Sequence, residues 1–187
     1  IHRKWNWNRW AVHEPFIDGE KLPFFSWYNQ SYGIGFYEYF LLSEMLGANA
    51  VPVLSVGLAC QYQSYELVPI DTPEFETYVQ DALDLIEFAN GDVNTKWGGL
   101  RAQMGHPESF GLRYLAIGNE QWETDKVDFF ARYQRFEKAI HEKYPKIELL
   151  GSVGPDVISE HYTEGWNFYR EEIQKNDRFV TAVDEHY

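Results

Sequence analysis

The chain has 187 residues, and its 16 basic and 29 acidic side chains give it a formal charge of −13 at pH 7. An acidic chain without a cluster of lysines and arginines offers no electrostatic footprint for a phosphate backbone or an anionic membrane, which excludes nucleic acid and lipid as expected partners. With 44% apolar residues but no run of about 18 consecutive ones, the sequence predicts a folded globular domain without a membrane-spanning segment.

The first predicted elements are a helix and a strand. Over residues 35–46 the apolar side chains follow a helical spacing, and Gly47 offers a C-terminal stop. Residues 49–57 have the composition of a buried strand, although Pro52 lacks the amide hydrogen that a neighbouring strand would use.

The helix that follows is the best-marked element of the sequence. Thr72 can cap it, Pro73 suits its first position, and apolar side chains recur every three or four residues over 75–89 before Gly91 ends it. We expect a loop at Trp97-Gly98-Gly99.

The second half of the chain continues the alternation of strands and helices. Pro145 cannot continue a helix and therefore closes the middle one. The predicted elements are a strand over 113–117, a helix over 126–144, a strand over 147–153, a helix over 165–174 and a strand over 179–183.

This alternation predicts an α/β fold in which helices connect parallel strands, as an open doubly wound sheet or a (β/α)8 barrel. No glycine-rich phosphate loop follows a strand, and polar side chains gather where strands end, both of which favour the barrel. Because a barrel takes about 250 residues, we expect residues 1–187 to be one partial TIM barrel domain. The chain begins at Ile1 and stops right after an apolar run, so we expect it to be truncated at both ends.

Glu120 is the strongest single candidate for chemistry. It directly follows an apolar strand and has Asn119, a side chain able to bind a hydroxyl, beside it. A carboxyl at such a strand end can be partly desolvated, which raises its pKa and lets it donate a proton near neutral pH. A helix-capping or surface carboxylate is the equally weighted alternative.

A second polar cluster follows the last predicted strand, at Asp184-Glu185-His186-Tyr187. It can line a pocket with hydroxyl-binding groups, whereas a metal site would need further ligands at a recognisable spacing, which are absent. We therefore expect no metal and no cofactor. Because consecutive strand residues point to opposite faces, either His186 or Tyr187 is expected to point inward, but not both.

Aromatic residues are dense near the N-terminus, in a region without helix or strand periodicity. They can form stacking platforms for sugar rings, and Trp27 is a weak candidate for that role, or they can cover one end of the barrel. Trp97 and Trp122 carry the same two readings, close to the suspected site. This N-terminal group comprises Trp5, Trp7, Trp10, Trp27, Tyr28 and Tyr32.

Three further residues receive no catalytic role. His106 and His161 fall in expected loops, and the single cysteine, Cys60, is expected to be a buried bystander that leaves the redox compartment open. With the N-terminus expected to be missing, the compartment stays undetermined, with a secreted or periplasmic location open.

Five short blocks in order carry the strongest signal. They are Gly33-Ile34-Gly35-Phe36-Tyr37-Glu38-Tyr39, Ala89-Asn90-Gly91-Asp92 with Trp97-Gly98, Arg101-Ala102-Gln103-Met104-Gly105-His106-Pro107, Tyr114-Leu115-Ala116-Ile117-Gly118-Asn119-Glu120 and Asp184-Glu185-His186-Tyr187. Together they resemble glycoside hydrolase family 51, which consists mainly of α-L-arabinofuranosidases.

The resemblance implies a retaining glycosidase acting on arabinose-containing glycans. It implies that the chain spans approximately strands 3 to 6 of the barrel, that Glu120 is the general acid/base, and that Asn119 binds the sugar's 2-hydroxyl. His186 and Tyr187 match the positions of the sixth strand that border the sugar pocket. The nucleophile would be a glutamate after the seventh strand, beyond Tyr187.

Two other functions stay open at this stage. One is a carbohydrate-binding barrel that has lost catalysis, and the other is a different retaining hydrolase, such as an endoglucanase, that shares only the Asn-Glu pair. The Gly-Pro and Arg-Pro signposts that the family shows after its second strand are absent from residues 10–23, so the polymer that is cut also stays open, as does the oligomeric state.

We predict that the 187-residue chain has no glycosidase activity by itself. A retaining mechanism needs two carboxyl groups, and the resemblance supplies only Glu120 within this chain. Incubation of the isolated chain with an aryl α-L-arabinofuranoside tests this, and measurable turnover would contradict it.

Overall fold

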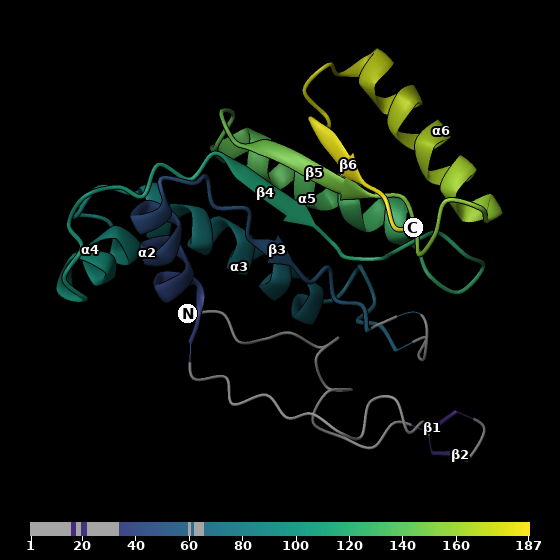
Figure 1. Ribbon diagram of the computed structural model, residues 1–187, viewed down its shortest axis with the longest axis horizontal. Coiled ribbons are helices and arrows are strands. Elements are labelled where there is room, and N and C mark those ends of the chain that lie inside the picture. The colour runs from purple at the N-terminus through teal and green to yellow at the C-terminus, as the bar shows by residue number, and fades with distance from the viewer. Residues whose placement is uncertain (1–15, 18–19, 22–33, 60, 62–65) are drawn as a thin grey trace.

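The computed structural model describes residues 16–17, 20–21, 34–59, 61 and 66–187. Its centre is a parallel four-stranded sheet with the strand order β3-β4-β5-β6, so the order in space follows the order in the chain (Figure 1). A short antiparallel pair of strands, β1 and β2, lies outside this sheet. The strands are β1 Phe16–Ile17, β2 Glu20–Lys21, β3 Val53–Leu54, β4 Tyr114–Ile117, β5 Glu148–Ser152 and β6 Ala182–Asp184.

Helices precede and connect these parallel strands. The alternation of helices and parallel strands predicted from the sequence is confirmed, although β3 and β6 are shorter than the predicted runs. Among the described residues, no helix is both long and apolar enough to cross a membrane. The helices are α2 Phe36–Leu46, α3 Pro73–Asn90, α4 Lys96–Gln103, α5 Phe129–Lys143 and α6 Glu160–Lys175.

Helix α4 corrects the loop predicted around Trp97. Thr95 caps this helix by accepting a hydrogen bond from the Gly98 amide at 3.1 Å. A Cβ atom on Gly98 would lie 2.2 Å from the Asp92 carbonyl oxygen, so the glycine is present for a close backbone approach and not for a turn. Glycine content alone therefore misled the prediction, because a capped helix can tolerate it.

Neighbouring helices pack against one another in chain order. The Tyr37 ring on α2 contacts Phe88 on α3, and Phe75 on α3 contacts Phe136 on α5, both edge to face. Phe130 on α5 stacks on Phe168 of α6, with ring centroids 4.1 Å apart. Helices that follow the strand order in this way form one layer along the sheet.

The two faces of the sheet differ in burial. Leu115, Ile117 and Leu149 are fully buried, while the alternate residues Ala116 and Leu150 are only partly buried. Since successive strand residues point to opposite faces, the core lies between the sheet and its helices. The other face, which carries Ala116 and Leu150, is the face on which polar side chains meet at the ends of the strands.

Gly151 lets helix α6 approach strand β5 closely. A Cβ atom at this position would lie 2.2 Å from the hydroxyl oxygen of Tyr169, which is 1% exposed. That hydroxyl accepts a hydrogen bond from the Ser152 amide at 3.1 Å and donates one to the Ser152 carbonyl at 3.3 Å. Burial raises the pKa of the Tyr169 phenol, so it remains a neutral group able to do both. The contact fixes the end of β5.

Arg101 organises the opposite end of the sheet. Its guanidinium is buried and donates to four carbonyl oxygens, those of Phe88, Gly91, His106 and Pro107, at 2.7 to 3.0 Å. The first two belong to the C-terminal end of α3, where a positive charge is favourable. This cation thus ties α3 to the loop that precedes β4.

His106 joins α2 to the same loop, and we predict that it makes stability pH-dependent. Its Nε2 lies 3.0 Å from Glu44 Oε2 and its Nδ1 lies 2.8 Å from the Glu108 carbonyl oxygen. Burial alone would lower the pKa of His106, but these two hydrogen bonds outweigh it and raise the pKa above the usual 6.5. The stabilisation should therefore be complete below pH 6.5 and disappear as the pH rises through the raised pKa.

The measurement compares the natural protein that contains this sequence with its His106→Gln variant, using amide hydrogen exchange over residues 101–112. We expect the variant to lose about 1 kcal/mol of local stability at pH 6 and much less at pH 9. A difference that stays constant over this pH range would contradict the prediction.

Candidate active site

The turn after β4 places Glu120 at the carboxyl end of the sheet. Gly118 has a φ of 83°, and a Cβ atom on it would lie 2.5 Å from Gln121 Oε1, so only glycine fits. Glu120 follows with a φ of 51°, the one non-glycine residue with positive φ among those described. Such a conformation is strained in a residue with a Cβ atom, and strain of this kind clusters at functional sites.

Glu120 meets His186 across the sheet. Glu120 Oε1 lies 2.9 Å from His186 Nδ1, and the two side chains are 44% and 30% exposed. Glu120 follows β4 and His186 follows β6, with β5 between them. Because neighbouring strands lie about 4.8 Å apart, this contact spans the width of β5, and it lies over the face opposite the helices.

Asp184 is the third member of this polar group. Its Oδ2 lies 3.7 Å from His186 Nε2, and its Oδ1 is buried without a hydrogen-bond partner among the described residues. Burial raises the pKa of Asp184, and the nearby Glu120 carboxylate acts in the same direction, while Ser152 and His186 oppose the shift. The imidazole of His186 thus lies between two carboxyl groups.

Glu185 and Tyr187 belong to the other face. Glu185 Oε1 accepts hydrogen bonds from the Tyr162 hydroxyl at 2.8 Å and the Trp166 indole at 3.1 Å, and these contacts tie the end of β6 to α6. The Tyr187 hydroxyl donates to Glu185 Oε2 at 2.8 Å, and Tyr187 is 99% exposed. Hydrogen bonds from the hydroxyls of Tyr162 and Tyr187 lower the pKa of Glu185. Of the two residues predicted to compete for the inward position, the structure brings His186 to Glu120 and leaves Tyr187 with Glu185.

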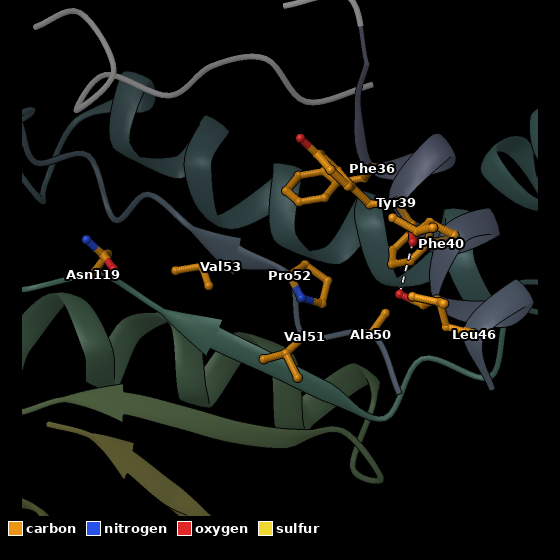
Figure 2. A pocket seen from close by; sticks show the side chains of 11 residues that line it. Phe36, Tyr39, Phe40, Leu46, Ala50, Val51, Pro52, Val53 and Asn119 are labelled. Carbon is orange, nitrogen blue, oxygen red and sulfur yellow. Dashed lines mark hydrogen bonds between the residues drawn. The ribbon is translucent and has the colours of Figure 1, made fainter. Parts of the chain in front are cut away.

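Asn119 faces a separate pocket of about 440 Å³ on the β3 side of Glu120. Figure 2 shows its carboxamide at one end of this pocket, with Phe36, Tyr39 and Phe40 of α2 at the other. The lining between them is mostly apolar and includes Pro52. Asn119 and Glu120 are therefore adjacent in the chain but face different surroundings.

Trp97 and Trp122, which the sequence placed together near the site, lie at opposite ends of the sheet. The ring of Trp122 lies 5.6 Å from that of His161, beside the Glu120 turn. Trp97, expected near the site, is instead on α4, where its amide donates to Glu87 Oε1 near the C-terminal end of α3, at the opposite end of the sheet (Figure 1). Closeness in sequence to the other site motifs therefore does not place a residue at the same end of the sheet. Trp27, Cys60 and the N-terminal aromatic group lie outside the described residues.

Two anchors of the Glu120 turn were missed in the sequence. The Gln121 amide donates to Ser152 Oγ at 3.1 Å, and Gln61 forms two hydrogen bonds with the main chain of Trp122. Ser152 could have been found, because it is a polar residue near the end of a predicted strand. Gln61 carries no local signal, since its partner is 61 residues away. Within the described part of the chain, no group of three or more His, Cys, Asp or Glu residues could hold a metal ion.

Comparison with known proteins gives a consistent set of relatives. The model of the family described as the α-L-arabinofuranosidase 1 domain matches residues 1–187. An extracellular exo-α-L-arabinofuranosidase of Streptomyces chartreusis is 42% identical over 160 residues, which are 86% of this chain and 18% of that protein. α-L-Arabinofuranosidase 2 of Arabidopsis thaliana is 40% identical over 120 residues, 64% of this chain and 17% of that protein. The chain thus spans about a fifth of the length of these relatives.

Solved structures resemble the same region. The arabinose-bound structure of the MgGH51 α-L-arabinofuranosidase superposes with a TM-score of 0.55 at 26% identity, covering 79% of this chain and 22% of that one. AbfB, a family 51 α-L-arabinofuranosidase from Bifidobacterium longum, gives a TM-score of 0.61 at 16% identity, covering 82% of this chain and 28% of that one, and supports the fold alone.

The raised pKa of Asp184 leads to a prediction about stability. A carboxyl whose pKa is higher in the folded state destabilises the fold as the pH rises from below 3.8 through the raised value. The uncharged Asp184→Asn variant should therefore be more stable than the unchanged protein at pH 7, by less than about 1 kcal/mol because solvent screens the partly exposed group.

Urea unfolding at pH 7 and pH 4 checks this, with Asp177→Asn, a change at an exposed position, as the matched control. The gain of the Asp184 variant should shrink at pH 4. An Asp184 variant that is less stable than the unchanged protein at pH 7 would contradict the prediction.

Proposed function

The chain belongs to the α-L-arabinofuranosidases of glycoside hydrolase family 51, and we propose that it supplies the acid/base part of the catalytic domain of such an enzyme. The observation that carries the proposal is the position of Glu120, in a strained turn at the carboxyl end of β4 with one oxygen held by His186. The reaction is the release of α-L-arabinofuranosyl residues from arabinose-containing glycans. The names of the relatives, and the arabinose bound to one structural neighbour, support this substrate class.

We propose that the domain is a partial (β/α)8 barrel comprising approximately strands 3 to 6. Four parallel strands without a reversal of order support this, because an open doubly wound sheet reverses its order at a switch point. The single layer of helices and the meeting of Glu120 with His186 across β5 both fit a sheet that curves toward closure. Barrel enzymes carry their chemistry at the carboxyl ends of the strands, where Glu120 lies.

Glu120 acts in both halves of a retaining reaction. It first protonates the departing glycosidic oxygen, while a second carboxylate attacks the anomeric carbon and forms a glycosyl-enzyme. It then removes a proton from the water that releases arabinose. With Oε1 placed against His186, we assign Oε2 to the leaving-group oxygen. The attacking carboxylate is the glutamate expected beyond Tyr187.

Asn119 is assigned to the 2-hydroxyl of the sugar. Asn119 directly precedes Glu120 in the chain, and its carboxamide can donate to and accept from a hydroxyl. His186 borders the sugar on the other side of Glu120. For Tyr187, the hydrogen bond with Glu185 supports a role at the rim of the pocket more than direct contact with the sugar.

The two alternative functions have less support. An endoglucanase would share only the Asn-Glu pair, whereas the relatives named above match most of this chain and are named arabinofuranosidases. A binding protein without catalysis has no need of a strained carboxylate at the strand end, because the strain is retained only where it serves the site.

The test of the proposal is the Glu120→Ala variant of the natural protein that contains this sequence. We expect kcat/KM for an arabinofuranoside with a poor leaving group to fall by about 10²- to 10⁴-fold, because proton donation is lost. With an activated aryl arabinofuranoside, the rate of the first step should fall less. Added azide should then give α-L-arabinofuranosyl azide, with retained configuration.

The matched control is Glu171→Ala, which removes an exposed carboxylate from α6 and should leave the rate unchanged. If Glu120→Ala kept full activity on the poor leaving group, Glu120 would not be the acid/base. If the unchanged protein bound arabinose-decorated glycans without cleaving them, the binding function would replace the enzymatic one.

A further inference from the structure

The strained turn at Glu120 requires contacts from outside β4 to hold it. A left-handed backbone at a residue with a Cβ atom persists only where its surroundings fix it. The residues directly after Glu120 are held from both sides. From the β5 side, Ser152 accepts a hydrogen bond from the Gln121 amide at 3.1 Å.

The contact from the β3 side is a pair of hydrogen bonds from one side chain. Gln61 Nε2 donates to the Trp122 carbonyl oxygen at 2.9 Å, and the Trp122 amide donates to Gln61 Oε1 at 3.0 Å. The carboxamide thus pairs with the main chain as another peptide group would, and only one orientation of the amide satisfies both bonds. Gln61 is 7% exposed, so little water competes for these bonds.

The described residues on either side of Gln61 are anchored. Leu58 forms an isolated β-bridge with Leu67, and the Ala59 amide donates to the Glu66 carbonyl at 3.0 Å. Leu58 is 1% exposed and belongs to the core. Nearer to β3, the buried Arg132 of α5 donates to the Val56 carbonyl oxygen at 3.0 Å.

We infer that Gln61 is a positioning residue for Glu120, acting through the main chain of Trp122. The inference deepens the proposed function, because it rests on Glu120 being the acid/base. Trp122 is two residues beyond Glu120, and its ring also packs near His161. With Gln61 on one side and Ser152 on the other, the turn cannot relax toward a right-handed backbone without breaking buried hydrogen bonds.

Loss of Gln61 should impair proton donation by Glu120 in particular. Protonation of the leaving group depends steeply on the placement of the acid, and a displacement of about 1 Å can cost about 100-fold in rate. A leaving group that departs without a proton is insensitive to that placement. Loss of Gln61 should therefore steepen the dependence of the rate on the leaving group, which a loss of stability alone would not do.

The experiment uses the Gln61→Met variant of the natural protein that contains this sequence, since methionine keeps the length of the side chain and removes both hydrogen bonds. We expect kcat/KM for a methyl or alkyl α-L-arabinofuranoside to fall by about 10- to 100-fold. For the 2,4-dinitrophenyl glycoside, whose leaving group needs no proton, the fall should be less than about 3-fold.

The chain provides a matched control at the other end of the same strand. Asn90 forms the same kind of pair with Leu112, donating to its carbonyl and accepting from its amide, both at 2.7 Å. Asn90→Ala therefore removes an equivalent pair far from Glu120. It should lower thermal stability but change the two rates by the same factor.

The positioning role would be overturned if Gln61→Met lowered both rates by the same factor, or lowered neither of them. If this variant does not fold, Gln61→Glu serves instead, because it keeps the acceptor for the Trp122 amide. It should show the same selective fall in the rate on the alkyl glycoside, to a smaller extent. An equal fall in both rates would again overturn the inference. Failure of the unchanged protein to hydrolyse either substrate is a different result, which would overturn the proposed function and the positioning role together.

Discussion

A left-handed backbone at Glu120 is the constraint on which the carboxyl end of the sheet depends. It places the carboxylate against His186, beyond β5, and it follows a second residue with positive φ, Gly118, whose own close contacts leave no room for a Cβ atom. The conformation is unfavourable by itself, so neighbouring strands must hold it. The polar contacts around Glu120 therefore act together to hold this strained backbone.

Buried hydrogen bonds hold both ends of the sheet, and the carboxyl end carries partly exposed polar groups as well. At the end where the strands begin, the buried Arg101 satisfies four carbonyl oxygens, and Asn90 pairs with the main chain of Leu112. At the other end, the buried Gln61 and Ser152 hold the main chain after Glu120. Beside them, Glu120, His186 and Asp184 contact one another and remain partly exposed. Fully satisfied buried groups give rigidity, whereas exposed carboxyl groups remain able to exchange protons with a substrate.

Helix α6 links these two requirements. Tyr169 packs against Gly151 and fixes the end of β5, which carries Ser152, while Tyr162 and Trp166 bind Glu185 at the end of β6. Alternate residues at the end of β6 and directly after it therefore have different neighbours: Glu185 faces the helix, and Asp184 and His186 lie on the side of Glu120. The period of two along a strand is what allows one short segment to do both.

Much of this protein could be predicted from the sequence. The helical spacing over 75–89, the caps at Thr72 and Gly91 and the polar residues after two strands are local signals. They predicted the α/β order and singled out Glu120 and the cluster Asp184-Glu185-His186-Tyr187. Which residues meet in space could not be predicted in this way. Only the tertiary structure decided that Gln61 holds the Glu120 turn, that Trp97 lies at the far end of the sheet, and that His186 rather than Tyr187 meets Glu120. Contacts between residues about 60 apart in the chain depend on how strands are registered and how loops close, and no local pattern of residues encodes either.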